Sequence, residues 1–287
     1  MGHGDHWAAI YGDVEPVLER LIPTVAQAGK PLGNGVVAQV QDEDGGTHKA
    51  QSTAVVYPPN VPLTYLMLLA GRADGNGYEM HSFYPLLREG IASPLKVEES
   101  TAWEGSLEGQ IRARTLDGAI IGFFDPLYYQ NQGVYRAGAA YNFIIAGLAY
   151  QLRKCESDFV EITEGAMLDV ERESVKKEDP TADVSQIKSV KVYLTGATIL
   201  LPSESTLDDW GFRLHADRVG YFEVDGIGFY RIESTLIKGE HHPLRAYIYA
   251  SVTVLGEYRP AEGDDIEGAV WLQGYLQSPE ELAVPAE

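Results

Sequence analysis

Two pairs of adjacent carboxylates are the residues best suited by type and spacing to do chemistry. They are Asp208-Asp209 and Asp264-Asp265, and two glutamates flank the second pair. Glycoside hydrolases use paired carboxylates as acid, base or nucleophile. Clustered carboxylates also bind Ca²⁺ or Mg²⁺, but the spacing here does not match a calcium-binding loop. We therefore predict polar turns at both pairs, with a carbohydrate-active hydrolase as an alternative function.

Histidine and cysteine give weaker signals. His3 and His6 lie near the N-terminus, where a mobile segment makes a poor metal site, and His241-His242 is expected at a loop tip. Cys155 is the only cysteine, which excludes an intrachain disulfide and a Cys-based zinc site. No phosphate-binding loop, dinucleotide fingerprint, nucleophile elbow or His-Glu-x-x-His helix is present. We predict no metal and no cofactor, and the sequence leans away from an enzyme.

Aromatic residues are the other candidates for binding, because the chain contains 17 tyrosines. Aromatic side chains on the open face of a small barrel stack sugars or bases, although tyrosines also pack across neighbouring strands. Both interpretations stay open from the sequence. The predicted binding residues are Tyr128, Tyr129, Tyr247, Tyr249, Trp271 and Tyr275.

The charge balance limits the classes of partner. The chain has 22 basic and 42 acidic residues, a net charge of −20. Binding to nucleic acid or to anionic lipid depends on cationic groups, so both are disfavoured. A single-stranded nucleic-acid binder remains a second alternative, which predicts that the few arginines gather on one face of a barrel. Those arginines are Arg213, Arg218, Arg231, Arg245 and Arg259.

The sequence shows neither a secretory signal nor a membrane span. The N-terminus lacks a positively charged start followed by an apolar region. The longest apolar candidate, residues 143–152, is about half the length of a transmembrane helix and is interrupted by Gly147 and Gln151. We therefore expect a cytoplasmic protein that does not enter a membrane.

These residues need a scaffold, and the patterns predict a mainly β one. Residues 1–32 have apolar positions at helical spacing, and from Gly35 the period changes to two, which predicts a hairpin ending near Tyr57. In residues 141–152 the alanines favour a helix, whereas Tyr141, Phe143 and Ile145 alternate as in a strand. We favour the strand.

A loose internal repeat suggests that the β structure is built twice. An Asp-Gly pair at 117–118, two aromatics at 123–124 and Tyr-Arg at 135–136 recur at 225–226, 229–230 and 258–259. Asp-Gly is favoured in two-residue hairpin turns because both residues accept positive φ. We predict two small antiparallel β-barrel or sandwich units with an N-terminal helix.

The expected organisation has four parts. Residues 1–32 are helical, 33–155 form the first β domain, 156–186 are an acidic linker or excursion, and 187–280 form the second β domain. A short exposed helix is expected at 166–177. Five hairpin-connected strands over residues 190–276 resemble an OB-like barrel.

The leading functional hypothesis is a non-enzymatic protein-binding or assembly module. It follows from the lack of a recognisable catalytic motif, the duplicated β units and the abundant tyrosine. The expected partner is another protein or a second copy of the chain.

Overall fold

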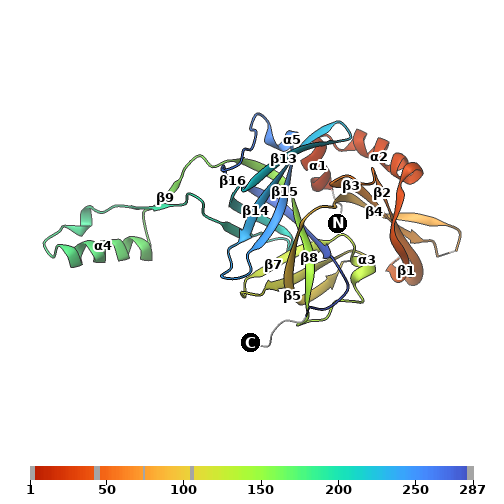
Figure 1. The fold of residues 1–287 in the computed structure, drawn as a ribbon, viewed down its shortest axis with the longest axis horizontal. Helices are drawn as coiled ribbons and strands as arrows, with labels where there is room; N and C mark the ends of the chain where they lie inside the picture. Colours follow the sequence, from red (N-terminus) through yellow and green to blue (C-terminus); the bar gives the residue numbers. More distant parts are fainter. Residues whose placement is uncertain (1–3, 42–45, 74, 104–106, 283–287) are drawn as a thin grey trace.

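The computed structural model describes residues 4–41, 46–73, 75–103 and 107–282, and it is mainly β, with 51% strand and 17% helix. The helices lie at the N-terminus, in two short turns and in one projecting segment (Figure 1). They are α1 (Gly4–Tyr11), α2 (Glu15–Ala28), α3 (Tyr128–Asn131), α4 (Ala166–Glu178), the 3-10 helix Val184–Gln186, and α5 (Val252–Leu255).

A closed five-stranded barrel forms the centre of the fold. Strand β16 pairs with β8 in the antiparallel direction. It also pairs with β7 in the parallel direction at one position, where Gln273 lies opposite Phe124, so the barrel is mixed. Along β6, buried Ile111 and Ala113 alternate with the more exposed Arg112 and Arg114, as expected for a strand with one face inward. The barrel strands are β5 (Ile91–Ala102), β6 (Gly109–Thr115), β7 (Ile120–Asp125), β8 (Ala140–Lys154) and β16 (Asp265–Leu276).

Five further strands extend this sheet on either side of the barrel. Strands β12 and β11 continue from β16, and β15, β14 and β13 continue from β8. The Asp217 N–H donates to the Glu233 carbonyl oxygen at 2.9 Å, which brings the segment after β12 back to β14. These strands are β11 (Ile199–Pro202), β12 (Asp209–His215), β13 (Arg218–Val224), β14 (Ile227–Ile237) and β15 (Leu244–Ser251).

A separate antiparallel sheet and the first two helices cover one side of the barrel. Helix α2 buries Leu21 and Val25 against this sheet, and the Trp7 indole of α1 donates to the Phe83 carbonyl oxygen at 3.1 Å. One apolar core joins these elements to outward-facing barrel residues such as Trp271. The sheet order is β1 (Lys30–Gln41), β2 (Thr47–Tyr57), β3 (Leu63–Gly71) and β4 (Tyr78–Leu87).

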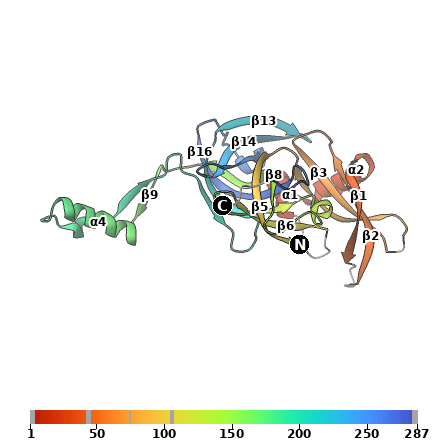
Figure 2. The ribbon, with the colours of Figure 1, turned by 60° about the horizontal axis from the view of Figure 1, so that its bottom comes forward.

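Residues 158–194 leave the barrel as a projecting arm, which is visible in both ribbon views (Figures 1 and 2). Strands β9 (Phe159–Ile162) and β10 (Val190–Tyr193) pair antiparallel to form its stem, and α4 lies at its outer end. The Leu194 N–H donates to the Asp158 carbonyl oxygen at 2.6 Å, so the arm's two ends meet.

The mainly β fold with N-terminal helices is confirmed, but its organisation differs from two separate antiparallel units. The structure has one closed mixed barrel and one separate four-stranded antiparallel sheet. Barrel strands come from both expected domains, because β16 pairs with β8 from Ile266 opposite Lys154 to Leu276 opposite Phe143. The strand at 141–152 and the helix at 166–177 are present as β8 and α4.

The N-terminus differs from the mobile segment that was expected. His6 lies in α1 and its ring stacks on the Trp271 indole, with 3.6 Å between the ring centroids. His3 lies outside the described residues. Helix α2 also continues through Pro23 and ends before β1 begins at Lys30.

The second Asp-Gly turn ties the sheet to the N-terminal helices. Asp225 has φ +52°, and its carboxylate accepts two bonds from the Arg20 guanidinium, at 3.0 and 2.5 Å, and one from the Tyr11 hydroxyl at 3.0 Å. Asp225→Ala removes these contacts and leaves a Cβ in the left-handed region. The pair with Arg20 is partly exposed and therefore weak.

We expect Asp225→Ala to lower the free energy of unfolding by about 2 kcal/mol in urea denaturation. Asp225→Asn keeps a side chain that tolerates positive φ and is expected to cost about half as much. An alanine variant as stable as the parent would show that this turn does not anchor the helices.

Candidate functional site

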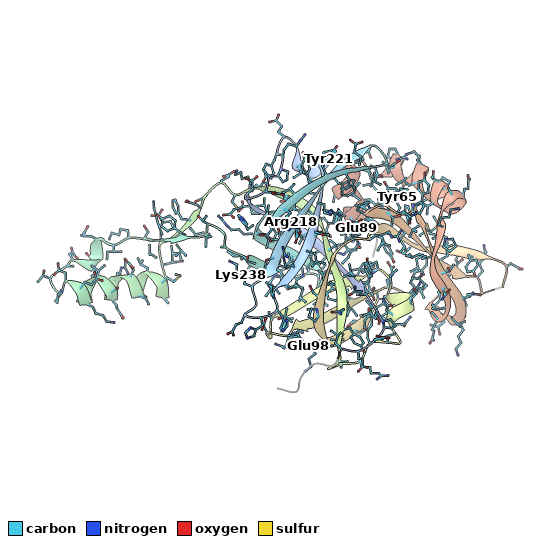
Figure 3. All side chains as sticks on the ribbon, viewed as in Figure 1. Tyr65, Glu89, Glu98, Arg218, Tyr221 and Lys238 are labelled. Atoms are coloured by element: carbon cyan, nitrogen blue, oxygen red, sulfur yellow. The ribbon has the colours of Figure 1, made fainter. Side chains whose placement is uncertain are left out.

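The arm carries large apolar side chains that the rest of the chain leaves exposed. Val160, Met167, Val170 and Tyr193 are between 47% and 69% exposed, whereas Leu168 is the one buried residue of α4. Met167 and Val170 are three residues apart and therefore share one face of the helix. We call these two residues the arm stripe. Figure 3 shows the arm's side chains standing clear of the barrel.

Local contacts hold α4 in place despite its small buried surface. The Arg172 guanidinium donates to the Ile187 carbonyl oxygen at 2.9 and 3.2 Å, which ties the helix to the returning segment. The Lys191 ammonium lies 4.2 Å from the centre of the Phe159 ring, across the two-stranded stem. A helix of this length with little packing is marginal in water, so burying the stripe against a partner would stabilise it.

A groove of about 780 Å³ lies at the foot of the arm. Residues of β8, β16, β12 and β11 form its walls together with Val160 and Leu194 of the arm. Leu201 stands at its edge and is 60% exposed, on a strand that forms one edge of the ten-stranded sheet. Its other large apolar wall residues are Leu152, Ile199, Phe212 and Val254.

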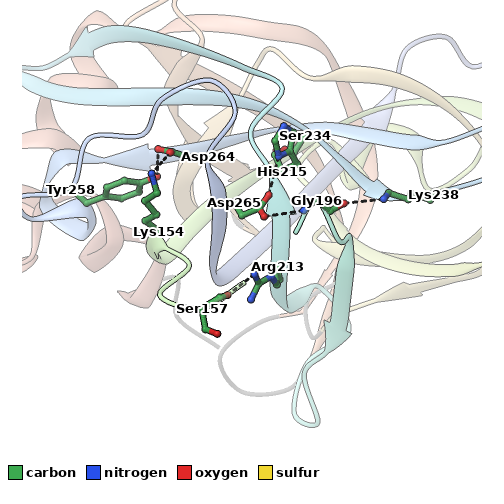
Figure 4. Close-up of polar contacts among 10 residues, drawn as sticks. All are labelled: Lys154, Ser157, Gly196, Arg213, His215, Ser234, Lys238, Tyr258, Asp264 and Asp265. Carbon is green, nitrogen blue, oxygen red and sulfur yellow. Dashed lines mark hydrogen bonds and ion pairs between the residues drawn. The ribbon is translucent and has the colours of Figure 1, made fainter. Parts of the chain in front are cut away.

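Asp264 and Asp265 lie at the arm's foot, where Asp264 forms an ion pair and Asp265 forms hydrogen bonds (Figure 4). Asp264 pairs with the Lys154 ammonium at 2.5 Å, and Asp265 accepts from the Gly196 N–H and from the His215 ring, both at 2.9 Å. Partial burial acts to raise the pKa of each carboxyl, but these hydrogen bonds outweigh it and hold both pKa values below the usual range.

Two further bonds fix the arm's ends to the sheet. The Arg213 guanidinium donates to the Ser157 carbonyl oxygen at 2.8 Å, and the Lys238 ammonium donates to the Gly196 carbonyl oxygen at 3.0 Å (Figure 4). Both ends of the arm are therefore held by side chains from β12 and from the segment after β14. These bonds hold the foot of the arm against the sheet, and the arm stripe lies at the other end of the arm.

The predicted binding aromatics lie mostly inside the fold. Trp271 and Tyr249 are fully buried, and Tyr128 and Tyr129 are nearly so. Their polar atoms bind neighbouring elements: the Tyr249 hydroxyl donates to the Glu89 carbonyl oxygen at 2.9 Å. Tyr247 and Tyr275 are half-buried, and neither lines the groove. A ligand-binding role for these six residues stays a prediction.

The arginines of the nucleic-acid alternative are largely committed to acidic neighbours or to the backbone. Arg231 pairs with Glu89 and lies 4.7 Å from the Tyr247 ring, and Arg245 pairs with Glu233 at 2.6 Å. Arg259 donates to nearby backbone carbonyl oxygens. Ion pairs of this kind reduce the positive field that phosphates need.

Asp208 and Asp209 are placed together, on a different surface from Asp264 and Asp265. They line a second cavity beside α1. The hydrolase alternative thus keeps one of its two carboxylate pairs in an aromatic-lined cleft and stays a prediction. The arm stripe was missed from the sequence, although Met167 and Val170 at helical spacing in a charged segment were its signal.

Comparison with known proteins does not identify a relative of this chain. The described residues show neither a helix that could span a membrane nor a cluster of metal ligands. Protein-family models, curated proteins and solved structures give no match to this chain. Among the described residues, no helix is long and apolar enough to cross a membrane. Within the same residues, no three His, Cys, Asp or Glu side chains are grouped to hold a metal ion.

Proposed function

We propose that this chain is a non-enzymatic assembly module whose partner is a second copy of itself. The observation that carries the proposal is the arm stripe, Met167 and Val170, exposed on a helix that stands away from the barrel. Exposed apolar side chains gathered at the end of a projecting element are characteristic of protein interaction sites.

Complementarity within one chain favours a second copy. The chain presents an apolar stripe on α4 and, at the arm's foot, a groove whose lining is mostly apolar but also includes Arg153, Arg213 and Glu267. Because the arm projects from a fixed foot, its outer end does not fold back on the groove of its own molecule. In a two-fold arrangement each stripe enters the other copy's groove, which is the self-complementary geometry of most dimers.

The net charge predicts an unusual salt dependence for such a dimer. Two copies that each carry −20 repel one another, and salt screens that repulsion. Self-association through apolar contacts should therefore strengthen as salt is raised. Binding to a foreign basic protein would weaken under the same change, so salt separates the two kinds of partner.

The test is light scattering and sedimentation equilibrium of the full chain at low and high salt. We expect a dimer that tightens with salt. Met167→Ser combined with Val170→Ser should raise its dissociation constant about 100-fold, because two apolar side chains at about 1.5 kcal/mol each no longer become buried. Leu201→Ser should weaken the dimer from the groove side.

Val37→Ser is the matched control, since Val37 is 73% exposed on β1 and lies outside both surfaces. It should leave the dimer unchanged. A strict monomer at both salt concentrations, or a double variant that associates like the parent, would reject the proposal. The OB-like resemblance of residues 190–276 and the nucleic-acid alternative remain predictions.

A further inference from the structure

A second cavity, of about 570 Å³, lies between α1 and the segment that leads into β12. Its volume falls in the range of small-molecule sites. Residues from α1, β6, β8 and positions 204–209 converge on it, although they are far apart in the chain. We call this cavity the acidic cleft.

Two neighbouring carboxylates line the cleft, and each already accepts two hydrogen bonds. Asp208 is 4% exposed and accepts from the Gln110 amide at 2.7 Å and from the Trp271 indole at 2.9 Å. Burial raises the pKa of Asp208. Asp209 accepts from the Tyr150 and Thr206 hydroxyls, both at 2.7 Å.

Aromatic rings supply flat walls beside these carboxylates. His6, stacked on Trp271, also stacks on Tyr150 with 5.8 Å between the ring centroids. Trp103 contributes a further indole to the lining. Such faces attract cations through their quadrupoles and stack on planar groups.

The charge of the lining selects among ligands. Asp5, Glu204, Asp208 and Asp209 line the cleft, and its described lining contains no lysine or arginine. Several of its donors are also committed, since the Tyr150, Thr206 and Gln110 groups donate to the two aspartates. A ligand must therefore bring N–H donors and positive charge, rather than acceptors.

We propose that the acidic cleft binds a small organic cation with an ammonium or guanidinium group. The cation lies between the carboxylates and the aromatic walls, and its N–H groups donate to the remaining carboxylate lone pairs. Guanidinium suits this arrangement because it is planar, carries several donors and stacks on rings. A neutral sugar would satisfy the aromatic walls but not the charge.

Calorimetric titration of the full chain with agmatine and spermidine tests the proposal, with cellobiose as the neutral probe. We expect both cations to bind, and their affinity to fall as salt is raised. Glu204→Gln, at an exposed position of the lining, should weaken agmatine about three-fold. Combining it with Asp5→Asn should give about ten-fold.

Glu240→Gln is the control, because Glu240 is exposed and lies outside the cleft. It removes the same charge from the chain and should leave agmatine affinity unchanged. Binding of cellobiose without binding of the cations would overturn the proposal in favour of a carbohydrate site. Absence of binding by all three probes, or equal affinity in parent and Glu204→Gln, would also overturn it.

Discussion

Gly268→Ala is expected to lower the free energy of unfolding by about 3 kcal/mol, because it forces apart the seam that closes the barrel. A Cβ at Gly268 would lie 1.9 Å from the carbonyl oxygen of Gln151, on the paired strand β8. The clash is with backbone, which yields only if β8 and β16 separate. Urea denaturation of parent and variant measures the loss.

Gly211→Ala provides the matched control on the adjacent strand β12. Gly211 pairs with Ala269, the residue after Gly268, but the nearest atom to its added Cβ is 3.8 Å away, an ordinary contact. We expect this variant to be close to the parent in stability. Similar losses from the two alanines would mean that the seam accommodates a side chain at Gly268.

The second large effect is a dependence of stability on pH that comes from Asp125. Its carboxyl is fully buried, which raises its pKa to about 6, although bonds from Tyr135, the Leu127 N–H and Asn131 oppose the shift. The unfolded group titrates near 3.8. The folded state therefore binds the proton more tightly, and this contribution is complete below about pH 4 and is lost as pH rises through 6.

The shift corresponds to about 3 kcal/mol at most. Asp125→Asn removes the titration, so the difference in unfolding free energy between variant and parent should change by about that amount from pH 4 to pH 7, measured by urea denaturation. Using the difference cancels the opposite slopes of Asp264 and Asp265. Asp13→Asn, at an exposed position, is the control. Parallel pH profiles for Asp125→Asn and parent would contradict the assignment.

Local patterns were enough to predict several strands but not their assembly. Alternation at Tyr141, Phe143 and Ile145 correctly indicated β8. Closure of the barrel depends on β8 pairing with β16, where Ile266 lies opposite Lys154. Periodicity within a strand says which residues share a face, and carries no information about a partner more than 100 residues away.

The same limit explains why most of the predicted binding residues are buried. Trp271 faces outward from the barrel strand β16, and Tyr249 lies on β15, outside the barrel. The sheet β1–β4 and the N-terminal helices cover both side chains. The acidic cleft also needs tertiary structure, because it unites His6 with Asp208. The two copies of the Asp-Gly pair also differ in turn conformation. Asp225 and Gly226 both have positive φ, whereas in the pair Asp117-Gly118 only the glycine does.

The meeting of Asp158 and Leu194 has a consequence for how the protein can vary. The chain leaves the barrel at Asp158 and returns to it at Leu194, and these two residues are hydrogen-bonded to each other. A short turn could therefore replace the whole arm without moving β8 or β12. Loop-closure entropy changes slowly with the length of chain enclosed, so arms of other lengths would cost the barrel little. Under the proposed function, the choice of partner and the stability of the barrel could therefore change independently of one another.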